Sequence, residues 1–172
     1  MRKVEVVSHQ EKWPHMFQDE CEKLLKIFVN DILNIHHIGS TAIPTIHAKP
    51  VIDMVVEVKW LNRVDEYNAD MDRIGYEAMG EYGIAHRRFF VKGGDKRTHH
   101  VHVFQRGNEE ITRHVRFRDY MIAHPEEAHK YSQLKKRLAK VFPNEMAEYI
   151  EGKNKYIQEI DKRAKKWANP PD

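Results

Sequence analysis

One carboxylate in an apolar stretch is the residue of this chain that most needs a chemical role. Asp53 lies within residues 51–58, a run rich in β-branched residues that is typical of a buried strand. Burying a carboxylate in such a strand costs free energy unless the group is paired or takes part in chemistry. We therefore expect Asp53 to be functional, and we expect Asp53→Asn to leave the stability unchanged or raised. The alternative is a structural acid that accepts hydrogen bonds from backbone amides.

A Gly-Ser pair precedes this strand and predicts an anion site. Gly39 allows the backbone to approach a ligand closely, and Ser40 stands where a helix N-cap is expected, with Thr41 behind it. Free amides at a helix start, together with the positive end of its dipole, favour a phosphate-sized anion. Lys49 precedes Pro50, which holds the lysine in an extended conformation, and the bend directs its side chain towards the same anion site. The alternative for the Gly-Ser pair is a tight turn with a cap.

A pair of histidines is expected beside the Asp53 strand. Residues 84–91 and 98–104 flank a Gly-Gly turn and predict a hairpin. Alternate residues of a strand share a face, so His100 and His102 point the same way. One carboxylate with two imidazoles suits Zn²⁺, Mn²⁺ or Fe²⁺ better than Mg²⁺. The same residues would equally suit a metal-free acid–base site, and the structural alternative is a pair of satisfied histidines on a hairpin.

The remaining candidates are arginines and histidines near these segments. Arg87 and Arg88 alternate faces, so at most one of them points into the site, and we expect it to be Arg88. His36 and His37 precede the Gly-Ser turn, and one of them could line the same pocket. Five further histidines are scattered and are interpreted as surface residues: His9, His15, His114, His124 and His129.

Length and composition indicate one globular domain. The chain has 172 residues, of which 41% are hydrophobic and 32% charged, and it contains one cysteine. We expect a single domain over residues 1–168 and a disordered tail over residues 169–172. No apolar run is long enough for a membrane span, and no signal-peptide core is present, so we expect a cytoplasmic protein. The formal charge of +3 does not indicate a nucleic-acid partner.

The periodicity along the chain predicts an α+β fold. Residues 3–7 are expected to form a short edge strand and residues 13–30 a helix, and residues 32–38 lead extended into the Gly-Ser turn. A second helix is expected over residues 61–74. Helices then fill the C-terminal third, the first ending before residue 124 and the next two starting at prolines 125 and 143. The prediction is a mixed sheet packed by helices, with a helical C-terminal third.

The order of these features resembles a known fold. A Gly-Ser pair, a helix-sized spacer and an acid in an apolar strand look like the opening signature of the nucleotidyltransferase fold. Within that superfamily, HIGSTAIPTIHAKPVIDM at residues 37–54 resembles the GrpB family, as do residues 75–76, 88–90, 100–103 and 124–139. The resemblance covers nearly the whole chain and implies a nucleotide or another phosphorylated small molecule as the partner.

This sequence contains only some of the residues that the chemistry of the superfamily requires. Its members set two acids two residues apart on one strand, where they hold Mg²⁺, but here Val55 occupies the position of the second acid. Glu57 lies roughly 13 Å along the strand from Asp53, too far to share a metal with it. Two hypotheses remain. One is a nucleotidyl or phosphoryl transferase in which Asp53, His100 and His102 hold Zn, Mn or Mg or act as acid–base groups. The other is a non-catalytic module that binds phosphate or a nucleotide.

Overall fold

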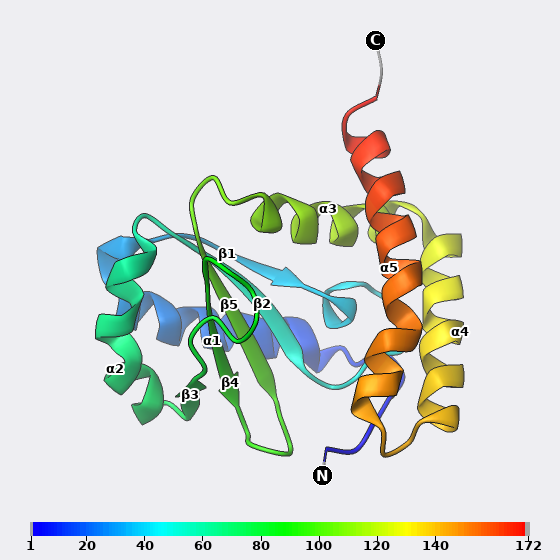
Figure 1. Cartoon of the computed structure of the whole chain (residues 1–172), viewed down its shortest axis with the longest axis horizontal. Coiled ribbons are helices and arrows are strands. Elements are labelled where there is room, and N and C mark those ends of the chain that lie inside the picture. The colour runs from blue at the N-terminus through cyan, green and yellow to red at the C-terminus, as the bar shows by residue number, and fades with distance from the viewer. Residues whose placement is uncertain (1, 171–172) are drawn as a thin grey trace.

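A computed structural model describes residues 2–170 and contains one five-stranded sheet in the order β1-β2-β5-β4-β3 (Figure 1). The parallel strands β2 and β5 are neighbours at its centre, and the other neighbouring pairs are antiparallel, as the predicted hairpin requires. The sheet is therefore mixed, as predicted. The strands are β1 (Ile32–Ile38), β2 (Ile52–Val58), β3 (Tyr76–Ala78), β4 (Arg87–Lys92) and β5 (His99–Gln105).

Helices account for most of the remaining chain. The α-helices are α1 (Lys12–Phe28), α2 (Asn68–Arg73), α3 (Glu109–Ala123), α4 (Pro125–Val141) and α5 (Met146–Ala168). Short 3₁₀ turns are η1 (Val29–Asp31), η2 (Ser40–Ala42) and η3 (Leu61–Tyr67). The helical C-terminal third is confirmed, although α5 begins at Met146 and not at Pro143. Of the predicted edge strand at residues 3–7, the structure shows a single bridge between Val7 and Ala48.

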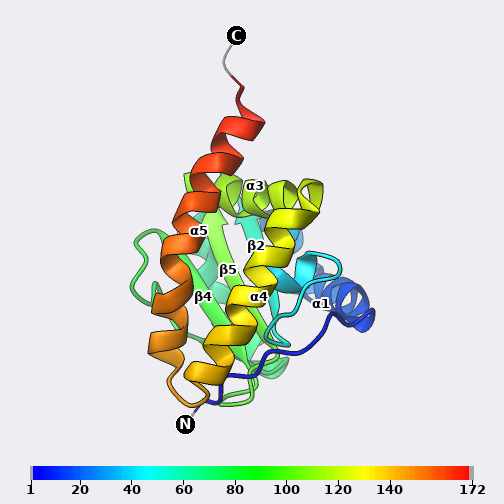
Figure 2. The ribbon, with the colours of Figure 1, turned by 90° about the vertical axis from the view of Figure 1, so that its right-hand side faces the viewer.

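The two faces of the sheet are covered by different helices. On one face, α1 packs Leu24 and Phe28 in a single core cluster with alternate residues of the central strands, such as Val56 and Val103. On the other face, α3 covers the sheet, with Ile111 in a cluster with strand residues. The helices α4 and α5 pack beside α3, on the same side of the sheet (Figures 1 and 2). The C-terminal helices therefore pack on the face of the sheet opposite to α1.

Strand pairing places the predicted site on the α3 face. In β2, Asp53 lies opposite His100 of β5, and Val55 lies opposite His102. Because side chains alternate along strands, these residues share one face of the sheet. Within residues 2–170, no helix is long and apolar enough to cross a membrane. Residues 171 and 172 of the predicted tail lie outside the described part of the chain.

Candidate functional site

A pocket of about 300 Å³ lies where the starts of β2 and β5 meet the C-terminal helices. Its sheet side includes Asp53 and His100, and the η2 turn forms another part of the wall. The helices contribute three groups of lining residues: Arg113, His114 and Phe117 from α3; Tyr131 and Lys135 from α4; and Tyr149, Lys153, Asn154 and Ile157 from α5. The pocket therefore gathers residues that are more than a hundred positions apart in sequence.

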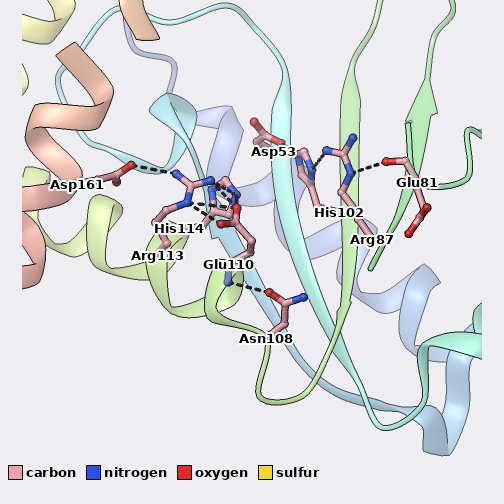
Figure 3. A network of polar contacts seen from close by, with 9 residues as sticks. All are labelled: Asp53, Glu81, Arg87, His102, Asn108, Glu110, Arg113, His114 and Asp161. Carbon is pink, nitrogen blue, oxygen red and sulfur yellow. Dashed lines mark hydrogen bonds and ion pairs between the residues drawn. The ribbon is translucent and has the colours of Figure 1, made fainter. Parts of the chain in front are cut away.

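A chain of hydrogen bonds holds the carboxylate at the base of this pocket. His102 Nε2 lies 2.7 Å from Asp53 Oδ1, and Arg87 Nη1 lies 3.1 Å from His102 Nδ1. An arginine can only donate, so His102 accepts at Nδ1 and donates its Nε2 proton to Asp53. Arg87 is itself fixed by donating to the carbonyl oxygen of Glu81 (Figure 3) and to that of Tyr82. The contacts set both the tautomer and the orientation of His102.

The same contacts keep Asp53 ionised. Burial alone would disfavour the charged carboxylate. In the low pH range where Asp53 titrates, the charge of the protonated His102 ring and its hydrogen bond outweigh burial, and the protonated rings of His100 and His114 add to the effect. As a result, the pKa of Asp53 lies well below its usual value. Asp53 thus presents a fixed negative charge at neutral pH.

Two more histidines lie beside Asp53 and are neutral at physiological pH. Burial, which outweighs the opposing charge of Asp53, lowers the pKa of His100 to about 4, and burial with the nearby Arg113 lowers that of His114 to about 4. Both rings lie beside arginines: Arg97 Nη1 is 3.4 Å from His100 Nε2, and Arg113 Nη2 is 3.2 Å from His114 Nε2. His114 was interpreted from the sequence as a surface residue, and that interpretation is wrong because α3 turns it into the pocket (Figure 3).

Three lysines place their amino groups in another part of the pocket wall. Lys49, Lys135 and Lys153 all line the pocket. Burial, together with the charges of Lys153 and Arg2, lowers the pKa of Lys49 to about 7. Burial and the charges of Lys153 and Lys49 also lower the pKa of Lys135, and burial lowers that of Lys153. The ammonium groups therefore lie close enough to repel one another.

The surroundings of these lysines are aromatic and carbonyl groups. Lys49 Nζ and Lys153 Nζ lie 5.6 Å and 5.0 Å from the ring centroid of Tyr149. Lys135 donates to the carbonyl oxygen of His47, and its Nζ lies 4.5 Å from the centroid of the Tyr131 ring. Arg113, by contrast, is paired with both Glu110 and Asp161 (Figure 3). In the part of the chain that the structure describes, Lys49, Lys135 and Lys153 have no such pair of carboxylates beside them.

The Gly-Ser turn lines the pocket but differs from the predicted helix start. The η2 turn is a single 3₁₀ turn whose N-cap position is Gly39 and not Ser40, and a glycine has no side chain that could cap the turn. One turn has almost no helix dipole, so the positive charge of the site comes from the lysines. Thr41 uses its hydroxyl within the protein, donating to the carbonyl of Val51 at 3.1 Å and contacting His37 Nε2 at 2.9 Å. Its role is to hold the turn against the strand.

Arg88 lies away from the pocket. It pairs with Asp65 at 2.8 Å, and β4 places it opposite Val103, on the α1 face of the sheet. The arginine beside Asp53 and His102 is Arg87, so the choice of Arg88 was wrong. A one-residue difference in strand register exchanges the two faces, and the sequence did not determine that register.

The donor set does not match the magnesium centre that the superfamily implies. Asp53 Oδ1 accepts the His102 proton, and both ring nitrogens of His102 are used within the protein. Among residues 2–170, no three His, Cys, Asp or Glu residues are grouped so that they could hold a metal ion. Lysines occupy the wall of the pocket, and ammonium groups repel metal cations instead of binding them. We therefore assign no chemical step to a metal.

Lys135, Tyr149 and Lys153 were not identified from the sequence, although one signal was available. In α4 and α5, a tyrosine precedes a lysine by four residues, at Tyr131/Lys135 and Tyr149/Lys153. This spacing puts both side chains on one helix face, and that face also carries the apolar residues that pack inwards. A lysine at an inward position is uncommon and indicates a buried function.

Comparisons with known proteins agree on family and fold. The profile of the GrpB protein family matches residues 3–163. UPF0157 protein YqkA of Bacillus subtilis is 48% identical over 166 residues, which are 96% of this chain and 48% of that protein. The chain thus spans about half the length of this relative.

Two solved structures resemble the chain. The crystal structure of the conserved protein GrpB from Enterococcus faecalis has a TM-score of 0.92 at 41% identity, covering 96% of this chain and 100% of that one. A structure of Cid1 in complex with the UTP analogue UMPNPP has a TM-score of 0.51 at 12% identity, covering 77% of this chain and 42% of that one. At this identity the second likeness concerns the fold alone, which is an α+β nucleotidyltransferase-like fold.

Proposed function

The chain belongs to the GrpB protein family, and we propose that its pocket binds a nucleotide or another phosphorylated ligand. The charge of the pocket wall carries this proposal. Lys49, Lys135 and Lys153 converge there, whereas Asp53 is the one acid among the described lining residues. Collecting ammonium groups away from water costs free energy. A phosphate would supply the missing negative charge and recover that cost on binding.

The size and composition of the pocket support a small ligand. A volume of about 300 Å³ lies at the lower end of the usual range for ligand pockets, roughly 300–1,000 Å³. Phe117, Tyr131 and Ile157 provide apolar surface for a base or another ring. The related fold of Cid1 is described in complex with a UTP analogue, and a nucleotide is therefore the first ligand to test.

Transfer of a nucleotidyl or phosphoryl group is a second candidate function, and the Asp53–His102 contact favours it. Asp53 lines the pocket and could accept a proton from an attacking hydroxyl, while His102 would position it. However, a carboxylate whose pKa is held this low is a weak base. The second acid of the superfamily is replaced by Val55, and Asp53 is a weak base. Both features favour ligand binding over group transfer.

A thermal-shift screen tests the proposal, because a ligand that binds only the native state raises the melting temperature. UTP, ATP, pyrophosphate and small phosphorylated metabolites would be screened with and without Mg²⁺, Mn²⁺ and Zn²⁺. We expect at least one phosphorylated compound to raise the melting temperature by several degrees. The double variant Lys49→Met/Lys153→Met should lose the shift.

The matched control is Lys155→Met/Lys162→Met, which removes two exposed lysines of α5. It lowers the net charge by the same amount and should keep the shift. If every phosphorylated compound leaves the parent unchanged, or if both double variants behave alike, the proposed function is wrong.

A further inference from the structure

Tyr149 has a buried hydroxyl without a hydrogen-bond partner. Its side chain is 0% exposed, and within residues 2–170 no group accepts from or donates to its oxygen. Burial, more than the neighbouring Tyr131, raises its pKa above the ordinary value, so the group stays a protonated donor. An unpaired buried hydroxyl costs free energy, and native proteins keep few of them. The position of Tyr149 in the pocket wall indicates that a ligand supplies the missing acceptor.

The neighbours of this hydroxyl indicate what kind of acceptor it is. Lys49, in the loop before β2, and Lys153, in α5, both lie over the Tyr149 ring, and both line the pocket. Lys49 Nζ donates to the thioether sulfur of Met146 at 3.9 Å, which is a poor acceptor. Two ammonium groups and one hydroxyl form a set of donors. The complementary group is an oxyanion with several acceptor oxygens, such as a phosphate.

We propose that Lys49, Tyr149 and Lys153 form a cradle that holds the phosphate end of the ligand without a divalent cation. The inference rests on the proposed function and deepens it, since it locates the phosphate and assigns the charge neutralisation to lysines. In the superfamily pattern, acids hold Mg²⁺ and the metal binds the phosphates. In this chain the second acid is Val55, and the lysines provide positive charge directly.

The cradle also gives the ligand a direction. The phosphate lies at the lysine wall, on α5 and beside Lys49, and the other end of the ligand points towards Asp53 and His114. Asp53 is an ionised acceptor at that end, so it favours a hydroxyl or amino group there. The ligand class is thus a phosphate ester or phosphoanhydride that carries a hydrogen-bond donor at its far end.

Calorimetric titration with inorganic pyrophosphate in the presence of EDTA tests the cradle. We expect the parent to bind under these conditions, and added Mg²⁺ to leave the affinity unchanged or lower it by complexing the ligand. Tyr149→Phe removes one hydrogen bond to a charged group and should weaken binding about tenfold. Lys153→Met should weaken it by at least as much, whereas Lys155→Met, on the exposed side of the same helix, should bind as the parent does.

The stability of the free protein separates a ligand contact from a structural one. Since Tyr149→Phe removes a donor that has no partner, its melting temperature without ligand should equal or exceed that of the parent. A clear fall would show that the hydroxyl is used within the fold, and it would overturn the cradle.

The outcomes also separate this inference from the proposed function. If pyrophosphate and UTP bind the parent and bind Tyr149→Phe and Lys153→Met equally well, the cradle alone is wrong. Binding that requires Mg²⁺ would contradict the cradle in the same way. If neither compound binds the parent at all, the proposed function fails and the cradle fails with it.

Discussion

His102 and Asp53 are in contact across the parallel strands β2 and β5 although they are not direct partners in the strand register. His102 Nε2 lies 2.7 Å from Asp53 Oδ1, while the residue opposite Asp53 is His100. Diagonal neighbours of this kind are within reach of long side chains. The contact explains how a carboxylate is tolerated in an apolar strand: it is paired with a donor that Arg87 orients.

Replacing Asp53 by asparagine should destabilise the protein. The sequence alone suggested a neutral or stabilising effect, but a lowered pKa means that the fold favours the ionised carboxylate. We expect Asp53→Asn to lower the free energy of unfolding by about 1 kcal/mol at pH 7, because asparagine still accepts from His102 but has no charge. Urea unfolding measures the difference.

The pH dependence and a control make this prediction specific. A carboxylate whose folded pKa is lowered contributes stability above its unfolded pKa of 3.8, and that stability is lost as the pH falls further. The difference in the free energy of unfolding between the parent and Asp53→Asn should therefore become smaller below about pH 4. Asp65→Asn removes an exposed ion pair with Arg88 and should change stability by less than about 0.5 kcal/mol. An Asp53→Asn variant as stable as the parent would support the original expectation.

Gly39 should be required for the placement of Asp53. Its φ is +70°, and a Cβ built there would lie 3.2 Å from both Cβ and Oδ2 of Asp53. Gly39→Ala therefore adds backbone strain and displaces the carboxylate, at a cost on the order of 1–3 kcal/mol. Gly80→Ala is the control, because Gly80 has a φ of +63° but no atom within 4 Å of the added Cβ. The chemical shifts of His102 should change in Gly39→Ala and stay unchanged in Gly80→Ala. Equal effects of the two substitutions would rule out the close contact between Gly39 and Asp53.

Arg87 should determine the tautomer of His102. In the parent, ¹⁵N spectra of the imidazole at neutral pH are expected to show the proton on Nε2, since Arg87 donates to Nδ1. Arg87→Met removes that donor and should give a mixture of tautomers. Arg88→Met serves as the control on the opposite face of the sheet and should keep the Nε2 tautomer. A parent spectrum with the proton on Nδ1 would contradict this assignment.

Ligand binding should be coupled to protonation of Lys49. The pKa of its ammonium group is lowered to about 7 by burial and by the charges of Lys153 and Arg2. A bound phosphate restores the ammonium form, so calorimetry in buffers of different ionisation enthalpy should show uptake approaching about one proton at pH 8 and little at pH 6. The Lys49→Met variant should take up fewer protons when it binds the same ligand at pH 8. Equal uptake in both proteins would exclude Lys49 as the titrating group.

The same lysine should affect the stability of the free protein. The unfolded chain binds more protons than the folded one between the folded pKa of about 7 and the ordinary value of 10.5. Stability therefore gains from Lys49 as the pH rises through this window, and the penalty of the buried charge is fully present below it. Lys49→Met should lack this rise and should be more stable than the parent at pH 6. If the free energies of unfolding of the two proteins change with pH in parallel, Lys49 does not make this contribution.

Local patterns in the sequence were sufficient for most of the fold. The apolar run around Asp53, the Gly-Gly turn of the hairpin and the helical periodicity after residue 108 each correspond to an element of the structure. The proximity of Asp53 to His102 followed from expecting their strands to be neighbours. Each of these features depends on residues within one element or one turn, where propensity and periodicity decide the outcome.

The cationic half of the pocket could not be derived in the same way. Lys49, Lys135 and Lys153 come together only because α4 and α5 pack beside α3 over the sheet. No local pattern encodes that packing, although the Tyr-Lys spacing hinted at an inward face. The choice between Arg87 and Arg88 depended on strand register, which a shift of one residue would reverse.

Locating a bound phosphate analogue would show directly whether the cradle holds an oxyanion. Crystals soaked in a low concentration of tungstate with EDTA would give an anomalous map in which each oxyanion is visible by its heavy atom. We expect the strongest peak in the pocket, within hydrogen-bonding reach of Lys49 Nζ, Tyr149 Oη and Lys153 Nζ. Peaks found only on exposed helix surfaces, with the pocket empty, would contradict it.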